Sequence, residues 1–132
     1  MTKQASELHF PKECRYTKTH EWAKVDGAEV VVGLDDFAQD QLGDIVFVEM
    51  PEVGATFKQG AVFSNVESVK AVSECFMPVS GEIVAVNGQI EEQPELVNGA
   101  CYGQGWLVKV KPADLAEMNA LMDAEACRAS IG

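Results

Sequence analysis

The chain has 132 residues, of which 47% are hydrophobic and 23% are charged, the composition of an ordinary globular domain. Its formal net charge of −11 argues against binding to nucleic acid, whose phosphates require lysine and arginine, and against an anionic membrane surface. No apolar run approaches the roughly 18–20 residues of a membrane-spanning helix. Residues 1–7 also lack the apolar stretch of a signal peptide, so we expect the protein in the cytoplasm. We also expect it to be a monomer.

Short β-rich runs dominate the middle of the chain. Glycine and proline separate these runs, as expected for turns between strands. Several short strands at this spacing are typical of an antiparallel sandwich or barrel, so the expected fold class is mainly β. The predicted strands are residues 29–34, 45–50, 61–68, 71–77, 82–87 and 106–111.

Two helices are predicted to accompany the strands. The first, residues 35–43, follows the first predicted strand and begins from Asp36 as its N-terminal cap. The second, residues 112–129, opens with Asp114 and Glu117, the spacing of a capping box, and continues with leucine and methionine at helical intervals. We expect this leucine and methionine stripe to be a packing face.

The cysteines are widely spaced and form no C-x-x-C pair. Zinc sites usually contain closely spaced ligand pairs, and only His9 and His20 could supplement the thiols. We therefore expect free thiols and no metal site. The four cysteines are Cys14, Cys75, Cys101 and Cys127.

A single lysine stands in the stretch VESVKAVSE, residues 66–74, with a glutamate on each side. Between residues 25 and 108 the only basic side chains are Lys58 and Lys70. Because Lys70 falls between two predicted strands, we expect it at a tight hairpin tip with its amine projecting into water. It is then either an exposed lysine paired with Glu67 or Glu74, or the attachment point of a prosthetic group that needs such an amine.

Motifs of catalysis are absent from the sequence. His20 is the only histidine within the predicted body of the fold, and there is neither a G-x-S-x-G elbow nor a glycine-rich phosphate loop. A hydrolase needs a nucleophile together with a base and an orienting group. We therefore expect a protein that has no catalytic residues.

The lysine stretch, with PVSGEIVAVN after it, resembles the lipoyl attachment hairpin of the glycine cleavage system H proteins. The resemblance runs from Arg15 to Ala129 and implies an N-terminal extension, residues 1–14, followed by one lipoyl-carrier domain, residues 15–132. Four further blocks follow the family order: YTKTHEW (16–22), VGLDDFAQDQLGDIVFVEMPEVG (32–54), PELVN (94–98) and YGQGWLVKVK (102–111).

The resemblance implies a lipoyl/biotinyl-type hybrid barrel-sandwich with lipoate amide-linked to Lys70. Glu67, Gly54 and Gly81 match positions that the family uses for recognition by lipoate ligase or by lipoyl/octanoyl transferase. The glycines would let the backbone turn tightly around the tip, and Glu67 would offer an acidic contact to a cationic ligase surface.

Two other interpretations of the hairpin remain. A biotin carrier has similar hairpin geometry but typically shows Met-Lys-Met, whereas this chain has Val69 and Ala71 beside the lysine. The second alternative is a binding module that is not modified at all.

Members of the family shelter the loaded arm in a surface cleft. The matching positions here are Thr19, His20, Glu21 and Glu74, and Glu21 is the first choice for an ion pair with the aminomethyl nitrogen. Phe37 stands where many members have histidine, which implies that one polar group of the cleft is missing.

The resemblance also implies partners and a role as carrier rather than enzyme. A glycine decarboxylase containing pyridoxal phosphate would load the arm, a folate-dependent aminomethyltransferase would unload it, and dihydrolipoyl dehydrogenase would reoxidise it. The alternative is a similar lipoate-binding protein of sulfur oxidation, working with a heterodisulfide-reductase-like system and carrying sulfur on the dihydrolipoyl thiols. Cys75 and Cys101 depart from the usual family pattern, and their thiols suit either core packing or redox chemistry.

Overall fold

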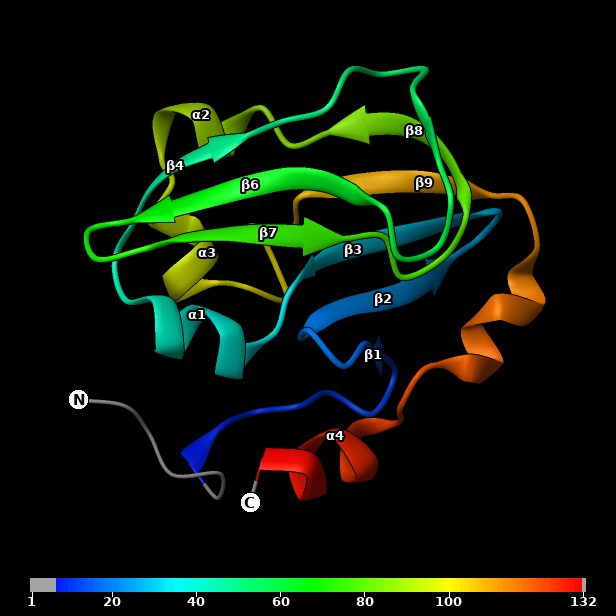
Figure 1. The fold of residues 1–132 in the computed structure, drawn as a ribbon, viewed down its shortest axis with the longest axis horizontal. Coiled ribbons are helices and arrows are strands. Elements are labelled where there is room, and N and C mark those ends of the chain that lie inside the picture. The colour runs from blue at the N-terminus through cyan, green and yellow to red at the C-terminus, as the bar shows by residue number, and fades with distance from the viewer. Residues whose placement is uncertain (1–6, 132) are drawn as a thin grey trace.

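The structure is a computed structural model that describes residues 7–131, and these residues form two antiparallel sheets with short helices around them (Figure 1). The larger sheet has the order β1-β2-β3-β9-β8-β5: Arg15–Tyr16, Glu21–Asp26, Glu29–Leu34, Val108–Pro112, Gly81–Val86 and Thr56–Phe57. The smaller sheet has the order β4-β6-β7: Ile45–Glu49, Val62–Ser68 and Val72–Phe76. The predicted mainly β class is confirmed.

The helices are short and lie at the margins of the sheets (Figure 1). Within residues 7–131, none of them has the length and apolarity needed to cross a membrane. The helices are α1 Asp36–Leu42, α2 Gln89–Glu92, α3 Leu96–Gly99, the 3₁₀ helix Leu115–Ala120 and α4 Ala124–Ile131.

The main core lies between the two sheets. Valines of β3 and β9 are paired across the larger sheet, with Val30 opposite Val110 and Val32 opposite Val108, and all four are fully buried. Val66 of β6 is also fully buried and belongs to the same apolar cluster. Alternation of side chains along a strand buries one face of each sheet and leaves the other for solvent.

A second apolar cluster packs outside the larger sheet. It joins Leu8 and Phe10 of the N-terminal segment to Tyr16 and Trp22 of the sheet and to Cys127 of α4. The hydroxyl of Tyr16 donates a hydrogen bond of 2.7 Å to the carbonyl oxygen of Pro11. Because Tyr16 and Trp22 lie on either side of residues 17–20, this cluster holds both ends of the turn before β2.

The N-terminal cap of α1 differs from the prediction. The capping residue is Asp35, whose carboxylate accepts a hydrogen bond of 2.9 Å from the backbone N–H of Ala38. Asp36 cannot serve as the cap because its own carboxylate accepts from Gln39 Nε2 at 2.7 Å and from the backbone N–H of His9. The predicted helix is confirmed, and its capping residue is corrected to Asp35.

The predicted C-terminal helix, residues 112–129, is divided into two. Asp114 caps the 3₁₀ helix, but Glu117 accepts hydrogen bonds from Ser80 instead of completing a capping box. The chain is then extended at Leu121, and Met122 exchanges two backbone hydrogen bonds of 2.8 Å with Tyr16. This bridge to β1 breaks the helical pattern, and α4 begins only at Ala124.

Candidate functional site

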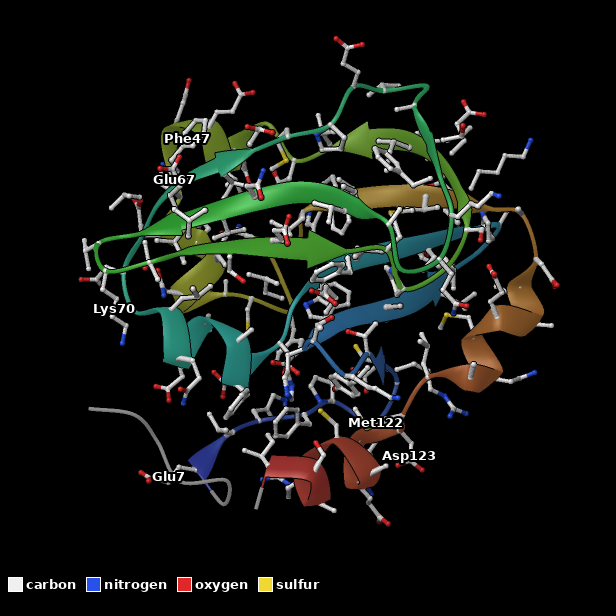
Figure 2. All side chains as sticks on the ribbon, viewed as in Figure 1. Glu7, Phe47, Glu67, Lys70, Met122 and Asp123 are labelled. Carbon is white, nitrogen blue, oxygen red and sulfur yellow. The ribbon has the colours of Figure 1, made fainter. Side chains whose placement is uncertain are left out.

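The hairpin between β6 and β7 displays Lys70 at its tip, at the edge of the molecule (Figure 2). The turn closes where the backbone N–H of Ser68 donates to the carbonyl oxygen of Ala71 at 2.8 Å. The Ser68 hydroxyl oxygen accepts from the backbone N–H groups of Lys70 and Ala71, so this side chain shapes the turn. The structure therefore places Lys70, as expected, on an exposed hairpin tip.

The loop after α1 supports the hairpin tip through a backbone hydrogen bond. The sequence did not predict this support. The backbone N–H of Val69 donates to the carbonyl oxygen of Asp44 in the loop after α1, at 3.0 Å. A Cβ placed on Gly43 would lie 3.6 Å from Lys70 Cε, so the lysine stem passes over that loop. In the described part of the chain, no ion pair joins Lys70 to Glu67 or Glu74, and the amine is not engaged as the paired-lysine interpretation required.

Glu67 lies three residues before the lysine, on the central strand of the small sheet and next to the end of that strand. It is opposite Phe47 of β4 on one side and Val72 of β7 on the other. Phe47 and Val72 are 52% and 65% exposed, respectively, so apolar side chains flank the carboxylate at the surface.

Gly54 and Gly81 lie together, but not at the hairpin tip. Gly54 has φ of +97° and donates its N–H to the carbonyl oxygen of Ile83, two residues beyond Gly81. Gly81 begins β8, where a Cβ would lie 2.3 Å from the carbonyl oxygen of Lys111. The expectation that these glycines turn the backbone around the tip is wrong, because residues 68–71 alone form that turn.

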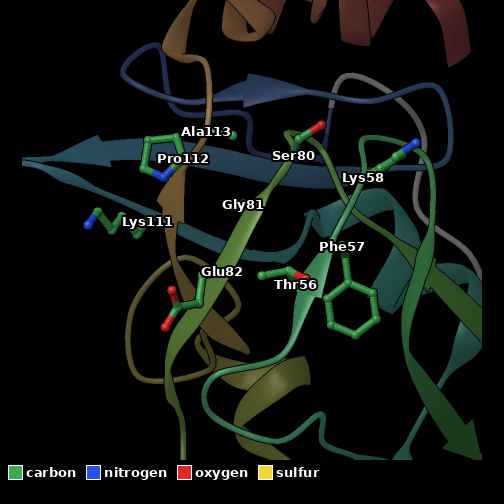
Figure 3. A pocket seen from close by; sticks show the side chains of 9 residues that line it. All are labelled: Thr56, Phe57, Lys58, Ser80, Gly81, Glu82, Lys111, Pro112 and Ala113. Carbon is green, nitrogen blue, oxygen red and sulfur yellow. The ribbon is translucent and has the colours of Figure 1, made fainter.

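A groove of about 690 Å³ lies beside Gly81, between β5, β8 and β9 (Figure 3). Phe57, Pro112 and the stem of Lys111 line it. Gly81 itself lines this groove, but none of the lining residues belongs to the hairpin or bonds Glu21, so the groove is separate from Lys70 and Glu21.

Glu21 is a buried carboxylate, only 1% exposed. Its Oε1 atom accepts hydrogen bonds from the hydroxyls of Thr17 at 2.6 Å and Thr19 at 2.5 Å, and the Phe76 backbone hydrogen-bonds the same carboxylate. Burial raises the pKa of Glu21 above its ordinary value, and these hydrogen bonds oppose that rise. Among residues 7–131, no lysine, arginine or histidine lies within ion-pair distance of it.

The threonines that hold Glu21 also line a surface pocket of about 420 Å³. This pocket is also lined by Phe76, the last residue of β7, by Met77 directly after it, and by Met122. Because β7 starts at the lysine hairpin and ends at this pocket, one strand connects the exposed amine to the buried carboxylate. The sequence did not predict Thr17 among the cleft residues. The signal that could have indicated it is its spacing of four residues from Glu21.

Three other residues predicted for the cleft lie outside the immediate surroundings of Glu21. The His20 ring pairs with Asp35 and lies 4.5 Å, between centroids, from the ring of Phe37. Phe37 thus packs against a histidine instead of contributing a polar group. Glu74 is exposed on β7, opposite Asn65 of β6.

Cys75 and Cys101 are both buried. Cys75 is fully buried in the main core, close enough to Glu21 for that carboxylate to contribute to raising the pKa of its thiol, although burial is the larger cause. The carbonyl oxygen of Cys101 accepts a hydrogen bond of 2.9 Å from the Trp22 indole.

Burial of Cys14 predicts a loss of stability at alkaline pH. Burial raises the pKa of its thiol from 9.0 to about 11, so the folded state binds a proton that the unfolded state loses. The contribution of the protonated Cys14 thiol to the free energy of unfolding is complete below pH 9. It is lost as pH rises through about 11. We expect Cys14→Ala to lose less free energy of unfolding than the wild type across this range, measured by urea titration. Equal losses in the two proteins would contradict this prediction.

Two antiparallel sheets that present one lysine at a hairpin tip are the architecture of a hybrid barrel-sandwich carrier domain. The family model described as "Glycine cleavage H-protein" matches residues 14–131. The chain therefore belongs to the glycine cleavage H-protein family, and the predicted resemblance is confirmed.

Individual relatives agree with this assignment. The chain is 51% identical over 124 residues to the glycine cleavage system H protein of Brevibacillus brevis, covering 94% of this chain and 98% of the relative. It is 48% identical to the Bacteroides fragilis protein of the same name, with the same coverage. The crystal structure of a glycine cleavage system H protein from Mycobacterium marinum superposes with a TM-score of 0.84 at 38% identity, covering 92% of this chain and 98% of that one.

Proposed function

We propose that this chain is the lipoyl carrier of a glycine cleavage system, with lipoate amide-linked to Lys70. The observation that carries the proposal is the exposed lysine, without an ion-pair partner in the described residues, at the hairpin tip of a chain about half identical to glycine cleavage H proteins. The partners are a pyridoxal-phosphate glycine decarboxylase, an aminomethyltransferase and dihydrolipoyl dehydrogenase. The chain acts as their common substrate and performs no catalytic step itself.

The residues at the tip fit a covalently attached arm. The Ser68 turn and the hydrogen bond from Val69 to Asp44 hold the backbone, while the lysine side chain keeps its exposure. Lipoate would supply a disulfide that accepts the aminomethyl group on one sulfur while the other sulfur is reduced to a thiol. Lipoate ligase or lipoyl/octanoyl transferase would recognise Glu67, with its apolar neighbours, on the small sheet. Gly54 and Gly81 would contribute to that recognition by maintaining the fold.

Glu21 is the residue that best suits a cationic cargo. A buried carboxylate is costly unless a positive charge or strong hydrogen bonds compensate it, and Glu21 has hydroxyl donors but no ion-pair partner among the described side chains. An aminomethyl ammonium would supply the missing charge. Thr19 and exposed Glu74 would complete the polar surroundings of the arm, and His20 and Phe37 would support the turn that carries Glu21.

The remaining features follow from the carrier role. We propose that residues 15–132 are the carrier domain, that residues 1–14 are an extension, and that the protein works as a cytoplasmic monomer without binding membrane or nucleic acid. Residues 1–6 of the extension lie outside the described part, whereas Leu8 and Phe10 are buried against the domain.

Sulfur transport, the alternative cargo, lacks support from the comparisons. The relatives described above carry the glycine cleavage name. Burial of Cys75 and Cys101 favours their role in packing over redox chemistry.

Exchange of labelled bicarbonate into glycine tests the proposed function, because the decarboxylase needs a lipoylated carrier for it. The lipoylated wild type should support exchange, and Lys70→Arg, carried through the same lipoylation reaction, should support none. A wild-type protein that carries the lipoyl mass but is inert with an active decarboxylase would contradict the glycine assignment.

A further inference from the structure

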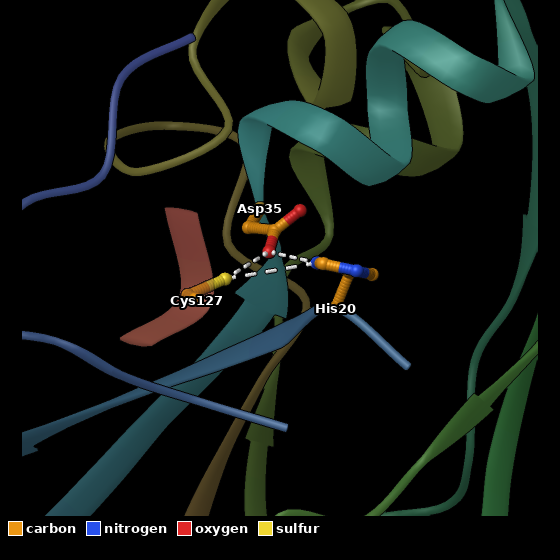
Figure 4. A group of neighbouring side chains, drawn as sticks. All are labelled: His20, Asp35 and Cys127. Carbon is orange, nitrogen blue, oxygen red and sulfur yellow. Dashed lines mark hydrogen bonds and ion pairs between the residues drawn. The ribbon is translucent and has the colours of Figure 1, made fainter. Parts of the chain in front are cut away.

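Three side chains that are far apart in the sequence converge outside the pocket that Thr17 and Thr19 line (Figure 4). His20 precedes β2, Asp35 caps α1 and Cys127 lies in α4. His20 Nδ1 is 2.8 Å from Asp35 Oδ2, and Cys127 Sγ is 3.6 Å from that oxygen and 3.8 Å from the same nitrogen. The three side chains therefore direct one nitrogen, one oxygen and one sulfur atom to a common point.

The backbone around each of the three side chains holds it in this position. His20 has φ of +70°, the only positive value at a non-glycine residue in the part that the structure describes, and its N–H donates to the Thr17 carbonyl oxygen. Asp35 uses Oδ1 to cap α1, which leaves Oδ2 for the cluster. Cys127 is fixed in the first turn of α4, where its N–H donates to the carbonyl oxygen of Asp123. The positive φ of His20, a conformation that costs free energy at a non-glycine residue, indicates a constrained turn at this site.

We propose that His20, Asp35 and Cys127 bind one divalent transition-metal ion of the zinc type. Nitrogen, sulfur and carboxylate oxygen are the ligands that zinc prefers, at about 2.0–2.3 Å. Tetrahedral angles at these bond lengths separate ligand atoms by roughly 3–4 Å. The observed separations of 2.8 to 3.8 Å require only small side-chain movements.

Binding would exchange protons for the metal. The Cys127 thiol would release its proton to solvent and bind as thiolate, and the imidazole proton would move from Nδ1 to Nε2 so that Nδ1 could donate its lone pair. Three protein ligands leave the fourth tetrahedral position for water. Asp35 and Cys127 are fully buried while the His20 side chain is 15% exposed, so the histidine side provides access for the ion.

The bound ion would join the C-terminal helix to the two segments that frame Glu21. His20 is the residue before Glu21, and Asp35 donates its backbone N–H to the His20 carbonyl oxygen at 2.9 Å. Widely spaced ligands explain why the sequence predicted no metal site, since 15 and 92 residues separate the members of this cluster.

Cobalt(II) titration of the full chain, purified with chelator and reductant, tests the proposal. We expect one equivalent to bind, with the near-ultraviolet charge-transfer band of a cobalt–thiolate bond, and zinc to displace it. Zinc should also raise the Tm of the wild type, because an ion that binds only the folded state stabilises it.

Two variants and one control complete the test. Cys127→Ala should abolish the thiolate band, and His20→Asn should weaken cobalt binding at least tenfold, because asparagine tolerates positive φ but lacks the imidazole. Cys14→Ala, which removes another buried thiol of the same apolar cluster, should bind as the wild type does. Absence of stoichiometric binding in the wild type, or an unchanged band in folded Cys127→Ala, would show that the three residues form only a hydrogen-bonded cluster.

Discussion

Replacement of Glu21 by glutamine is expected to shorten the lifetime of the aminomethyl-loaded carrier by about 10- to 100-fold. A hydrogen bond to a charged group is worth about 1.5–3 kcal/mol, and each 1.4 kcal/mol changes an equilibrium about tenfold. Glutamine keeps the size of the side chain and can still bond the two threonine hydroxyls, but it removes the charge that we propose to pair with the cargo amine. The measurement is the rate at which loaded, isolated carrier releases its cargo, followed by intact mass.

Glu82→Gln is the matched control for this experiment. Glu82 is exposed on β8, whereas Glu21 is buried and bonds the pocket residues Thr17 and Thr19, so replacing Glu82 removes the same charge away from that pocket. Its loaded form should be as long-lived as the wild type. Equal lifetimes for Glu21→Gln and the wild type would remove Glu21 from the proposed arm site, even if lipoylation at Lys70 were established.

Replacement of Gly81 by alanine is expected to destabilise the fold by about 3 kcal/mol or more. The new Cβ would lie 2.3 Å from the Lys111 carbonyl oxygen and 2.6 Å from Val110 Cγ1, so β8 and β9 would have to separate where they pair. For a domain of this size the Tm should fall by roughly 10 °C. Thermal unfolding followed by circular dichroism measures the change.

Gly88→Ala provides the comparison for Gly81→Ala. Gly88 has φ of −64°, and a Cβ added there would meet no atom within 4 Å, so alanine should fit with little effect on Tm. Lipoylation rates of both variants should be measured below their Tm values. If Gly81→Ala is as stable as the wild type yet is lipoylated slowly, then Gly81 acts directly in ligase recognition and the structural account of this residue is wrong.

The β architecture was predictable because its signals are local. Valine-rich runs such as residues 29–34 and glycine or proline turns fixed most strands to within two residues. Strand β2 escaped prediction, since its first three residues are buried and its last three are exposed, which gives no alternation. The break between the 3₁₀ helix and α4 also escaped, because it depends on pairing of Met122 with Tyr16, more than 100 residues away.

The candidate site was predictable only in part, for a related reason. Lys70 stands out in the sequence as an isolated cation on a hairpin, and the turn that displays it is local. The support from Asp44 and the burial of Glu21 against the end of β7 depend on tertiary packing. No motif spacing in the sequence predicts that His20 and Asp35 lie next to Cys127.

Intact mass after incubation with lipoate, ATP and a lipoate ligase tests the central claim most directly. The wild type should gain the mass of one lipoyl group, and fragment masses should place it on Lys70. Lys70→Arg, with the same charge at the same exposed tip, should keep its fold and gain no mass. A wild type that stays unmodified by a ligase active on another carrier, or a lipoyl group found in Lys70→Arg, would contradict the account.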